Sequence, residues 1–304
     1  MDLYKIEGEK VRFLKPKELA GPKGEYGLQR LIEKNLKEIF GLTFIDTEAV
    51  IQGKRLDTLA YDEENQRVVV IEYKKGRDSG VVDQGIAYLS LAHENKEFFE
   101  LKIEKKLGKS NLEIEWESTK VIFVARKFDD YQICASAIRG VPFELWSYDL
   151  YDGLLALRRI EETGTKTSFS TLIKGKKEQL GKISQEIRTY DLEYHLKKTK
   201  EELRQIFEGY RREIKAFGLE VLEVIDQKVG ITYKNNKKSF ARIEFDANAF
   251  RIIFKEKAGF VDPKNLSKDI REYKWGFERM ARVTSQENFD DTVYLLKQAY
   301  ETTA

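Results

Sequence analysis

Residues 53–78 read GKRLDTLAYDEENQRVVVIEYKKGRD, two apolar runs separated by the polar turn DEENQ. Apolar runs of this length that flank a short polar turn are typical of a β-hairpin. A four-residue loop at 63–66 pairs Asp62 with Arg67, so the residue numbers of every cross-strand pair sum to 129. The hairpin therefore has a predicted register as well as a predicted position.

That register places Asp57 directly opposite Glu72, with Cβ atoms about 4.5–5.5 Å apart. Lys74 lies two residues beyond Glu72 and is therefore expected on the same face of the sheet. Like charges directly opposite each other destabilise a strand pair. Two carboxylates and a lysine on a sheet face that is otherwise valine and isoleucine therefore indicate a bound divalent cation, which would offset the repulsion.

The composition indicates a globular protein with two domains. The 304 residues are enough for two cores, and 41% of them are hydrophobic. Charged residues make up 35%, but the two signs nearly cancel at +2, so any basic surface has to be local. No apolar run approaches the ~20 residues of a membrane span. The N-terminus lacks a signal-peptide pattern, which together with the single cysteine predicts a cytoplasmic protein without disulfides.

The chain contains two histidines, His93 and His195, and one cysteine, Cys134. These counts exclude a Cys/His zinc site and disfavour catalysis by a Cys–His pair or a Ser–His–Asp triad. Any chemistry therefore has to be carried by carboxylates and lysine. Carboxylate oxygens are hard ligands, which favour Mg²⁺ or Mn²⁺ over softer metals.

Apolar periodicity predicts alternating helices and strands in the first half of the chain. A helix is expected from Glu25 to Phe40, with Gly41 ending it. The following segments are expected as strands at 43–52, 54–61 and 67–75, a helix at 80–99, a strand at 120–127, a helix at 129–139 and a strand at 143–150. The order αβββαβ, followed by αβ, predicts an α/β fold in which helices cover a mixed sheet.

A change of composition divides the chain. Residues 161–189 are rich in Thr, Ser, Gly and Lys, which predicts a basic linker between a domain at 1–160 and a smaller one at 190–304. The smaller domain is expected to be α+β. Its predicted elements are two helices with a restart at a capping box near Thr199, strands at 230–234, 239–246 and 250–255, and a helix at 290–301.

The ordered motifs of the first domain resemble the PD-(D/E)xK nuclease superfamily, and more closely its NucS-like endonuclease domain. The similar segments are RLIEKNLKEIFGL, GKRLDTLAYD, VVVIEYKKGRD and VDQGIAYL, which span about residues 25–92. Leu56 stands where the superfamily often has a proline before the aspartate. The resemblance implies a restriction-endonuclease-like αβββαβ core and a DNA endonuclease that hydrolyses phosphodiester bonds with Mg²⁺ or Mn²⁺.

The resemblance assigns roles to the residues of the hairpin. Asp57 and Glu72 are the expected metal ligands, joined by the main-chain carbonyl of Tyr73. Lys74 is expected to orient the attacking water and to stabilise negative charge in the transition state. An aspartate followed by Glu-x-Lys also occurs by chance on a solvated strand face, so the ordered match of helix, hairpin and following helix is what favours a site.

Further site residues are implied around this motif. Gln84 and Tyr88, four residues apart on the next helix, resemble the Gln-x-x-x-Tyr element whose glutamine borders the metal site. Glu25 or Glu33 on the first helix resembles the auxiliary acid of such enzymes, and the sequence does not choose between them. Phosphate contacts are expected from the basic residues that follow the motif, Lys75 and Arg77.

The C-terminal segments REYKWGFER and FDDTVYLLKQAYE resemble a domain of unknown function found in so-called predicted transport proteins. No motif within it indicates chemistry, and no membrane span supports transport. Its cluster of Tyr273, Trp275, Phe277 and Arg279 has two interpretations. One is an aromatic and basic surface on which bases stack. The other, which the pattern favours, is a core tryptophan beside a glycine turn.

Two further functions stay open on the sequence. One is a catalytically inactive nucleic-acid-binding or partner-binding protein that retains the nuclease fold. The other is a partner-binding protein whose C-terminal domain performs the recognition. The intact Asp57, Glu72 and Lys74 favour the endonuclease, with DNA as its partner. The resemblance allows a homodimer, although no interface can be recognised in the sequence.

Overall fold

The predicted hairpin forms the centre of the first sheet. In the computed structural model, β4 (Lys54–Asp62) pairs antiparallel with β5 (Arg67–Lys74), and the ladder runs from Thr58↔Ile71 to Asp62↔Arg67. The residue numbers of each pair in this ladder sum to 129, which confirms the predicted register over this stretch. The structure describes residues 3–17, 23–74, 80–136, 142–160, 190–197, 199–225, 227–273 and 275–303. The predicted linker at 161–189 lies outside these residues.

The chain divides into two compact units, Met1–Thr189 and Tyr190–Ala304. The sheet of the first unit has the strand order β3-β4-β5-β6-β7-β8. The pairs β5–β6 and β6–β7 are parallel and the others are antiparallel, so the sheet is mixed. Its remaining strands are β3 (Thr43–Ile51), β6 (Lys120–Ala125), β7 (Phe143–Tyr151) and β8 (Leu154–Ile160).

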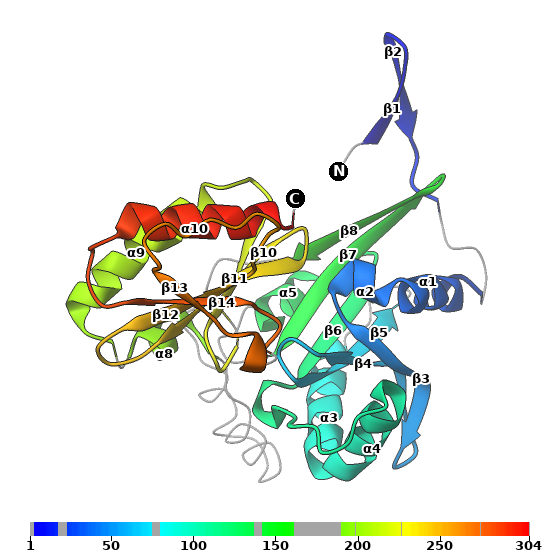
Figure 1. Cartoon of the computed structure of the whole chain (residues 1–304). Coiled ribbons are helices and arrows are strands. Elements are labelled where there is room, and N and C mark those ends of the chain that lie inside the picture. The colour runs from blue at the N-terminus through cyan, green and yellow to red at the C-terminus, as the bar shows by residue number, and fades with distance from the viewer. Residues whose placement is uncertain are drawn as a thin grey trace. The chain divides into compact units, whose positions relative to one another are not determined.

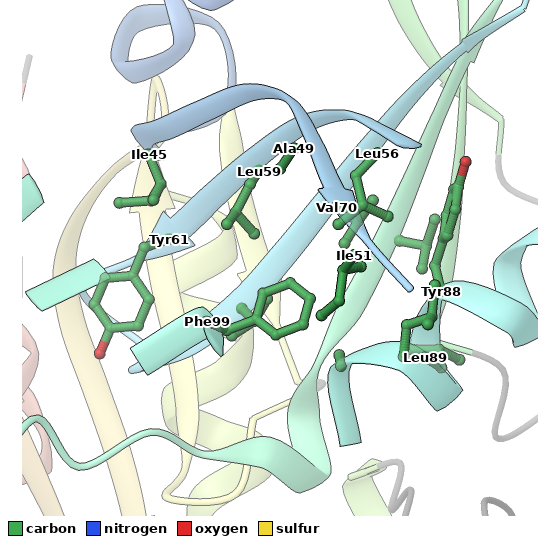
Figure 2. Close-up of a cluster of buried hydrophobic side chains, with 14 of the residues drawn as sticks. Ile45, Ala49, Ile51, Leu56, Leu59, Tyr61, Val70, Tyr88, Leu89 and Phe99 are labelled. Atoms are coloured by element: carbon green, nitrogen blue, oxygen red, sulfur yellow. The ribbon is translucent and has the colours of Figure 1, made fainter. Parts of the chain in front are cut away.

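Helices bury both faces of this sheet. One core lies between the sheet and the helices α1 (Lys23–Lys34) and α2 (Leu36–Phe40). As predicted, Gly41 ends α2, and it does so in the left-handed conformation at φ 72°. The other core lies under α3 (Val81–Glu94) and α4 (Lys96–Leu107), and Figure 2 shows its side chains from β3, β4, β5 and both helices. A short helix, α5 (Asp130–Ser136), precedes β7. The α/β fold class is confirmed.

Two predicted helices of the first unit are each divided in the structure. The helix expected from Glu25 to Phe40 is two helices, α1 and α2, which meet at Asn35. The helix expected at 80–99 is two helices, because the Asn95 side chain donates to the Leu91 carbonyl and ends α3 there. The sequence predicted no element before Glu25, but β1 (Leu3–Glu7) and β2 (Lys10–Leu14) form an antiparallel hairpin. That hairpin leaves Ile6 and Val11 exposed, which is why no core pattern marked it.

The second unit is an antiparallel sheet with helices on one face, as the α+β prediction required (Figure 1). Its strand order is β13-β14-β12-β11-β10-β9. The strands are β9 (Val221–Val224), β10 (Ile231–Asn235), β11 (Lys238–Phe245), β12 (Phe250–Phe254), β13 (Ser267–Asp269) and β14 (Arg279–Val283). Its helices are α8 (Leu192–Leu196), α9 (Glu201–Lys215) and α10 (Phe289–Glu301), and its 3-10 turn is η2 (Arg271–Tyr273).

Two sequence interpretations of this unit change. The restart near Thr199 is present, but its hydroxyl donates to the Asp246 carbonyl instead of capping α9, so the predicted capping box is wrong. Trp275 is 44% exposed, so the favoured core position for this residue is wrong as well.

Among the described helices of both units, none combines the length and apolar character that a membrane crossing requires.

Packing between α3 and the sheet makes Gly85 a sensitive position. A Cβ at Gly85 would lie 2.5 Å from Cζ of the buried Phe143 ring, whereas a Cβ at Gly27 in α1 would meet nothing within 4 Å. We expect Gly85→Ala to lower the free energy of unfolding by about 1–3 kcal/mol, because overpacking outweighs the gain in helix propensity. Gly27→Ala should raise it by roughly 0.5–1 kcal/mol. Urea denaturation measures both, and equal stability of the two variants would contradict this packing.

Candidate active site

The ladder between β4 and β5 stops just before the two carboxylates. Beyond the pair Thr58↔Ile71, the Asp57 side chain serves as the hydrogen-bond acceptor in place of the main chain. Its Oδ2 accepts the backbone N–H of Tyr73 at 3.0 Å. The predicted ladder pair of Asp57 with Glu72 is therefore absent from the described pairing, because a carboxylate has replaced a strand carbonyl as acceptor. A hydrogen bond to a charged acceptor is stronger than the ladder bond it replaces and fixes the orientation of the carboxylate.

Two side chains of α3 hold Glu72 in place. Gln84 Nε2 donates to Glu72 Oε1 at 2.6 Å, and the Tyr88 hydroxyl lies 2.8 Å from Glu72 Oε2. Gln84 and Tyr88 are four residues apart, so they lie on one face of the helix, and Gln84 also donates to the Tyr88 hydroxyl at 2.6 Å. The structure thus brings together the two helix residues that the sequence singled out.

Lys74 completes the cluster on the same strand. Its Nζ lies 3.3 Å from Glu72 Oε1, and the side chains of the two residues are only 14% and 8% exposed. An ion pair this far from water is costly unless further groups satisfy both partners. Here Gln84 and Tyr88 donate to the carboxylate, so the pair is held in place by neutral donors as well as by charge.

A second polar network supports Asp57 from α1, and the sequence did not reveal it. Gln29 Nε2 donates to the main-chain carbonyl of Asp57 at 2.8 Å and to Glu33 Oε1 at 3.0 Å. The Thr58 hydroxyl donates to the same glutamate oxygen at 2.8 Å. The helical spacing of Gln29 and Glu33 was the available signal, but both residues also fit the polar side of an amphipathic helix.

The contacts of this network show where Glu33, one of the two candidates for the auxiliary acid, lies. Glu33 is buried among Gln29 and Thr58, and its described contacts do not include Asp57 or Glu72 side chains. Glu33 thus supports β4 through Gln29 and Thr58, and its role as the auxiliary acid stays a prediction. Of the other candidates, the Glu25 side chain is not described. The phosphate-contacting residues that the sequence suggested, Lys75 and Arg77, lie outside the described residues.

Burial raises the pKa of both site carboxyls. For Asp57, the loss of water outweighs the Tyr73 N–H bond and the charges of Arg55 and Lys74, which act in the opposite direction. For Glu72, burial and the negative charge of Asp57 outweigh Tyr88, Lys74 and Gln84. The two carboxylates thus resist being ionised together, as like charges in a shared buried site do.

Tyr88 is fixed as a donor by the same environment. Burial, followed by the charge of Glu72, raises the pKa of its hydroxyl well above the ordinary value of 10. The hydroxyl therefore stays protonated at any physiological pH. It can donate to Glu72 Oε2 at 2.8 Å, which helps to orient that carboxylate, and it also lies 3.2 Å from the Arg55 carbonyl.

The donor set fits a hard divalent cation. Within the described ranges, no hydrogen bond or ion pair reaches Asp57 Oδ1, the second oxygen of a carboxylate whose other oxygen is fixed. The described parts of the chain contain no group of three or more His, Cys, Asp or Glu side chains that could hold a metal. A metal at this site would therefore have only two side-chain ligands within those parts, Asp57 and Glu72. Two carboxylates with a carbonyl and several waters suit Mg²⁺, which keeps much of its water shell in proteins.

Comparisons with known proteins give one extensive relationship. The chain is 32% identical over 281 residues to an uncharacterized protein of Haemophilus influenzae, and the match covers 90% of this chain and 92% of that protein. No family model matches the chain.

Two solved structures are similar to parts of the chain. A repair endonuclease from Pyrococcus abyssi matches at 19% identity and a TM-score of 0.25, over 42% of this chain and 47% of its own. A complex of EndoMS with double-stranded DNA matches at 13% identity and a TM-score of 0.25, over 48% and 64%. The chain thus spans less than two thirds of either endonuclease. TM-scores this low do not establish a function for this chain, so a proposed function has to rest on the geometry of the site.

The raised carboxyl pKa values predict how stability depends on pH. Above the ordinary pKa of a carboxyl, the folded protein holds protons that the unfolded chain has released, so stability falls as pH rises through this window. Asp57→Asn keeps an acceptor for Tyr73 N–H and removes the charge. In EDTA we expect the melting temperature of this variant to be higher than that of the wild type at pH 8 and equal to it at pH 4. Glu113→Gln, in an exposed loop, should match the wild type at both. A variant that melts below the wild type at pH 8 would contradict this electrostatic account.

The hydroxyl of Tyr88 should matter for stability through Glu72. Tyr88→Phe leaves the ring in the core and removes a donor to a buried carboxylate, which we expect to cost about 1–3 kcal/mol of unfolding free energy. The same change in a Glu72→Gln background should cost clearly less, because the charge that needs the donor is gone. Denaturant titration of the four proteins in this cycle gives the coupling energy. Additive costs would show that the hydroxyl acts independently of Glu72.

Proposed function

This chain belongs to one family with the uncharacterized Haemophilus influenzae protein, and we propose that its activity is metal-dependent hydrolysis of phosphodiester bonds in DNA. The observation that carries the proposal is the cluster of the buried Glu72 with the half-buried Asp57 and Lys74, completed by Gln84 from α3. The cluster has the order Asp, then Glu-x-Lys, on paired strands that the PD-(D/E)xK resemblance predicts. In this proposal the nuclease domain is residues 1–160, and the C-terminal domain at 190–304 is accessory.

The proposed metal ligands are Asp57, Glu72 and the Tyr73 carbonyl. When bound, Mg²⁺ or Mn²⁺ supplies Lewis-acid polarisation of the scissile phosphate and lowers the pKa of a coordinated water. Asp57 is oriented for this task by Tyr73 N–H, and its main chain is oriented by Gln29. Positive charge between the two carboxylates would also remove the repulsion that raises their pKa values.

The remaining cluster residues act on the reacting groups. The Lys74 ammonium group is placed beside Glu72 to orient the attacking water and to stabilise the negative charge that grows on the phosphate oxygens. A bond forms between phosphorus and the oxygen of the attacking water, which gives up one proton to solvent. The bond to the departing sugar oxygen breaks, and that oxygen takes up one proton from solvent. Gln84 holds Glu72 and is proposed to border the metal site. Lys75 and Arg77 are proposed to contact neighbouring phosphates.

Cleavage assays test this function directly. We expect the full chain to cut one or more of supercoiled plasmid, linear duplex, single-stranded and branched DNA with Mg²⁺ or Mn²⁺, and none with EDTA. Glu72→Gln and Lys74→Ala should each lower the rate by about 100-fold or more, since each removes a charge that acts on the transition state.

A matched variant separates chemistry from folding. Glu144 is a glutamate of the same sheet in a buried ion pair with Lys120, at 2.5 Å. Glu144→Gln should keep the wild-type rate while it is folded, as judged by circular dichroism. Metal-dependent cleavage that survives in Glu72→Gln would contradict the proposal. Failure of the wild type on every substrate would favour the inactive binding protein.

A further inference from the structure

The loop at 270–278 in the second unit is anchored at both ends. Ile270 N–H donates to the Glu278 carbonyl at 2.8 Å, and Ile270 and Phe277 are buried in a small cluster with Ile253. Gly276 has φ 78°, a conformation that favours glycine, and its carbonyl accepts a hydrogen bond from Lys255 Nζ. Both ends of the loop are therefore held by contacts with the rest of the unit.

Two aromatic rings project from this turn. Tyr273 and Trp275 are 46% and 44% exposed, and their rings stack with centroids 4.8 Å apart and an interplanar angle of 22°. Every other ring pair among the described residues is tilted or edge-on. Large aromatic side chains are usually buried because their burial is strongly favourable, so an exposed, ordered stack is informative.

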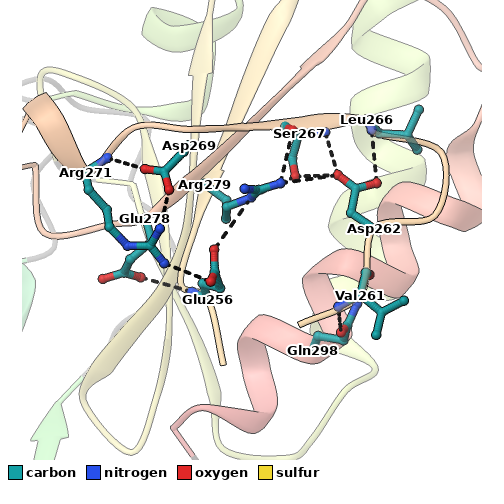
Figure 3. Close-up of polar contacts among 10 residues, drawn as sticks. All are labelled: Glu256, Val261, Asp262, Leu266, Ser267, Asp269, Arg271, Glu278, Arg279 and Gln298. Atoms are coloured by element: carbon teal, nitrogen blue, oxygen red, sulfur yellow. Dashed lines mark hydrogen bonds and ion pairs between the residues drawn. The ribbon is translucent and has the colours of Figure 1, made fainter. Parts of the chain in front are cut away.

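Ion pairs fix the base of the turn. Arg271 pairs with Asp269 and, at 2.8 Å, with Glu256, and Figure 3 shows these contacts beside Arg279. Arg279 in turn donates to the Ser267 hydroxyl at 3.1 Å. Asp269, Glu256 and Asp262 are thus engaged by Arg271 and Arg279. Glu278 is paired with Lys255, and Glu272 in the turn itself is exposed.

The sheet face next to the turn is basic. Ala281 and Val283 point into the core under the helices, so Met280 and Arg282 lie on the opposite face of β14. Phe277 packs against Met280 there, and Arg242 lies over the Phe277 ring at 5.3 Å. By the same alternation and the strand register, the described strands place five cations and one anion on this face. They are Lys234, Arg242, Arg251, Lys268 and Arg282, with Glu244 as the anion. Arg251 pairs with Glu244 at 3.0 Å and Arg242 is buried, so the exposed cations of this face are Lys268 and Arg282, on the two strands that the turn connects.

We propose that the Tyr273–Trp275 stack binds unpaired bases of a DNA strand whose phosphates run along this basic face. Stacking on aromatic rings is how proteins hold single-stranded nucleic acid without reading its sequence. Bases in a duplex are already stacked on both sides, so the two rings select unpaired nucleotides. A protein partner would also suit exposed aromatic residues, but the cation excess beside them matches a polyanion. The choice of DNA as the ligand rests on the proposed function.

Binding in the absence of metal tests this site. The full chain is titrated in EDTA into a fluorescein-labelled thymidine oligonucleotide of about 20 residues, and into a duplex of equal length. We expect tighter binding of the single strand, with Kd raised about 10-fold or more in Trp275→Ala and in Tyr273→Ala, since each removes a stacking surface. Trp275→Phe should keep most of the affinity because it keeps a ring.

An exposed tyrosine elsewhere in the unit provides the control. Tyr294 on α10 is 50% exposed, and Tyr294→Ala should bind like the wild type. The inference is overturned if Trp275→Ala binds like Tyr294→Ala, or if the wild type does not prefer the single strand. A protein-contact surface would then be the better interpretation. Because no metal is present, this result is independent of cleavage, and loss of cleavage in Glu72→Gln with unchanged oligonucleotide binding separates the two proposals.

Discussion

The first unit depends on two carboxylates that are kept from water on neighbouring strands. Asp57 and Glu72 raise the cost of folding at neutral pH, and much of the surrounding structure offsets that cost. The Tyr73 N–H, the Tyr88 hydroxyl and the Gln84 amide all donate to them. A fold that needed only stability would place apolar side chains here, because replacing buried charges by apolar groups is often neutral or stabilising.

The structure holds these carboxylates from both faces of the sheet. Glu72 is oriented by α3, whereas the main chain of Asp57 is oriented by Gln29 of α1. The parallel pairing of β5 with β6 places the site strand in the middle of the sheet, where both faces are covered. Positions this constrained are suited to chemistry that requires fixed donor atoms.

The sequence predicted the parts of the site that follow from periodicity. The hairpin register follows from the apolar runs and the turn, and Gln84 and Tyr88 meet because they are one helical turn apart. The capture of Tyr73 N–H by Asp57 could not be predicted, since a side chain that replaces a ladder carbonyl leaves no periodic signal. Short strands such as β9 and β13, and the exposure of Trp275, were missed because they depend on tertiary packing.

The most direct test of the central claim is calorimetric titration of Mn²⁺ into the full chain near pH 7, for the wild type, Asp57→Ala and Glu72→Ala. If the two carboxylates form a metal site, the wild type binds one ion per chain and both variants lose that binding. Wild type that binds no ion, alone or with a short duplex present, would contradict the account.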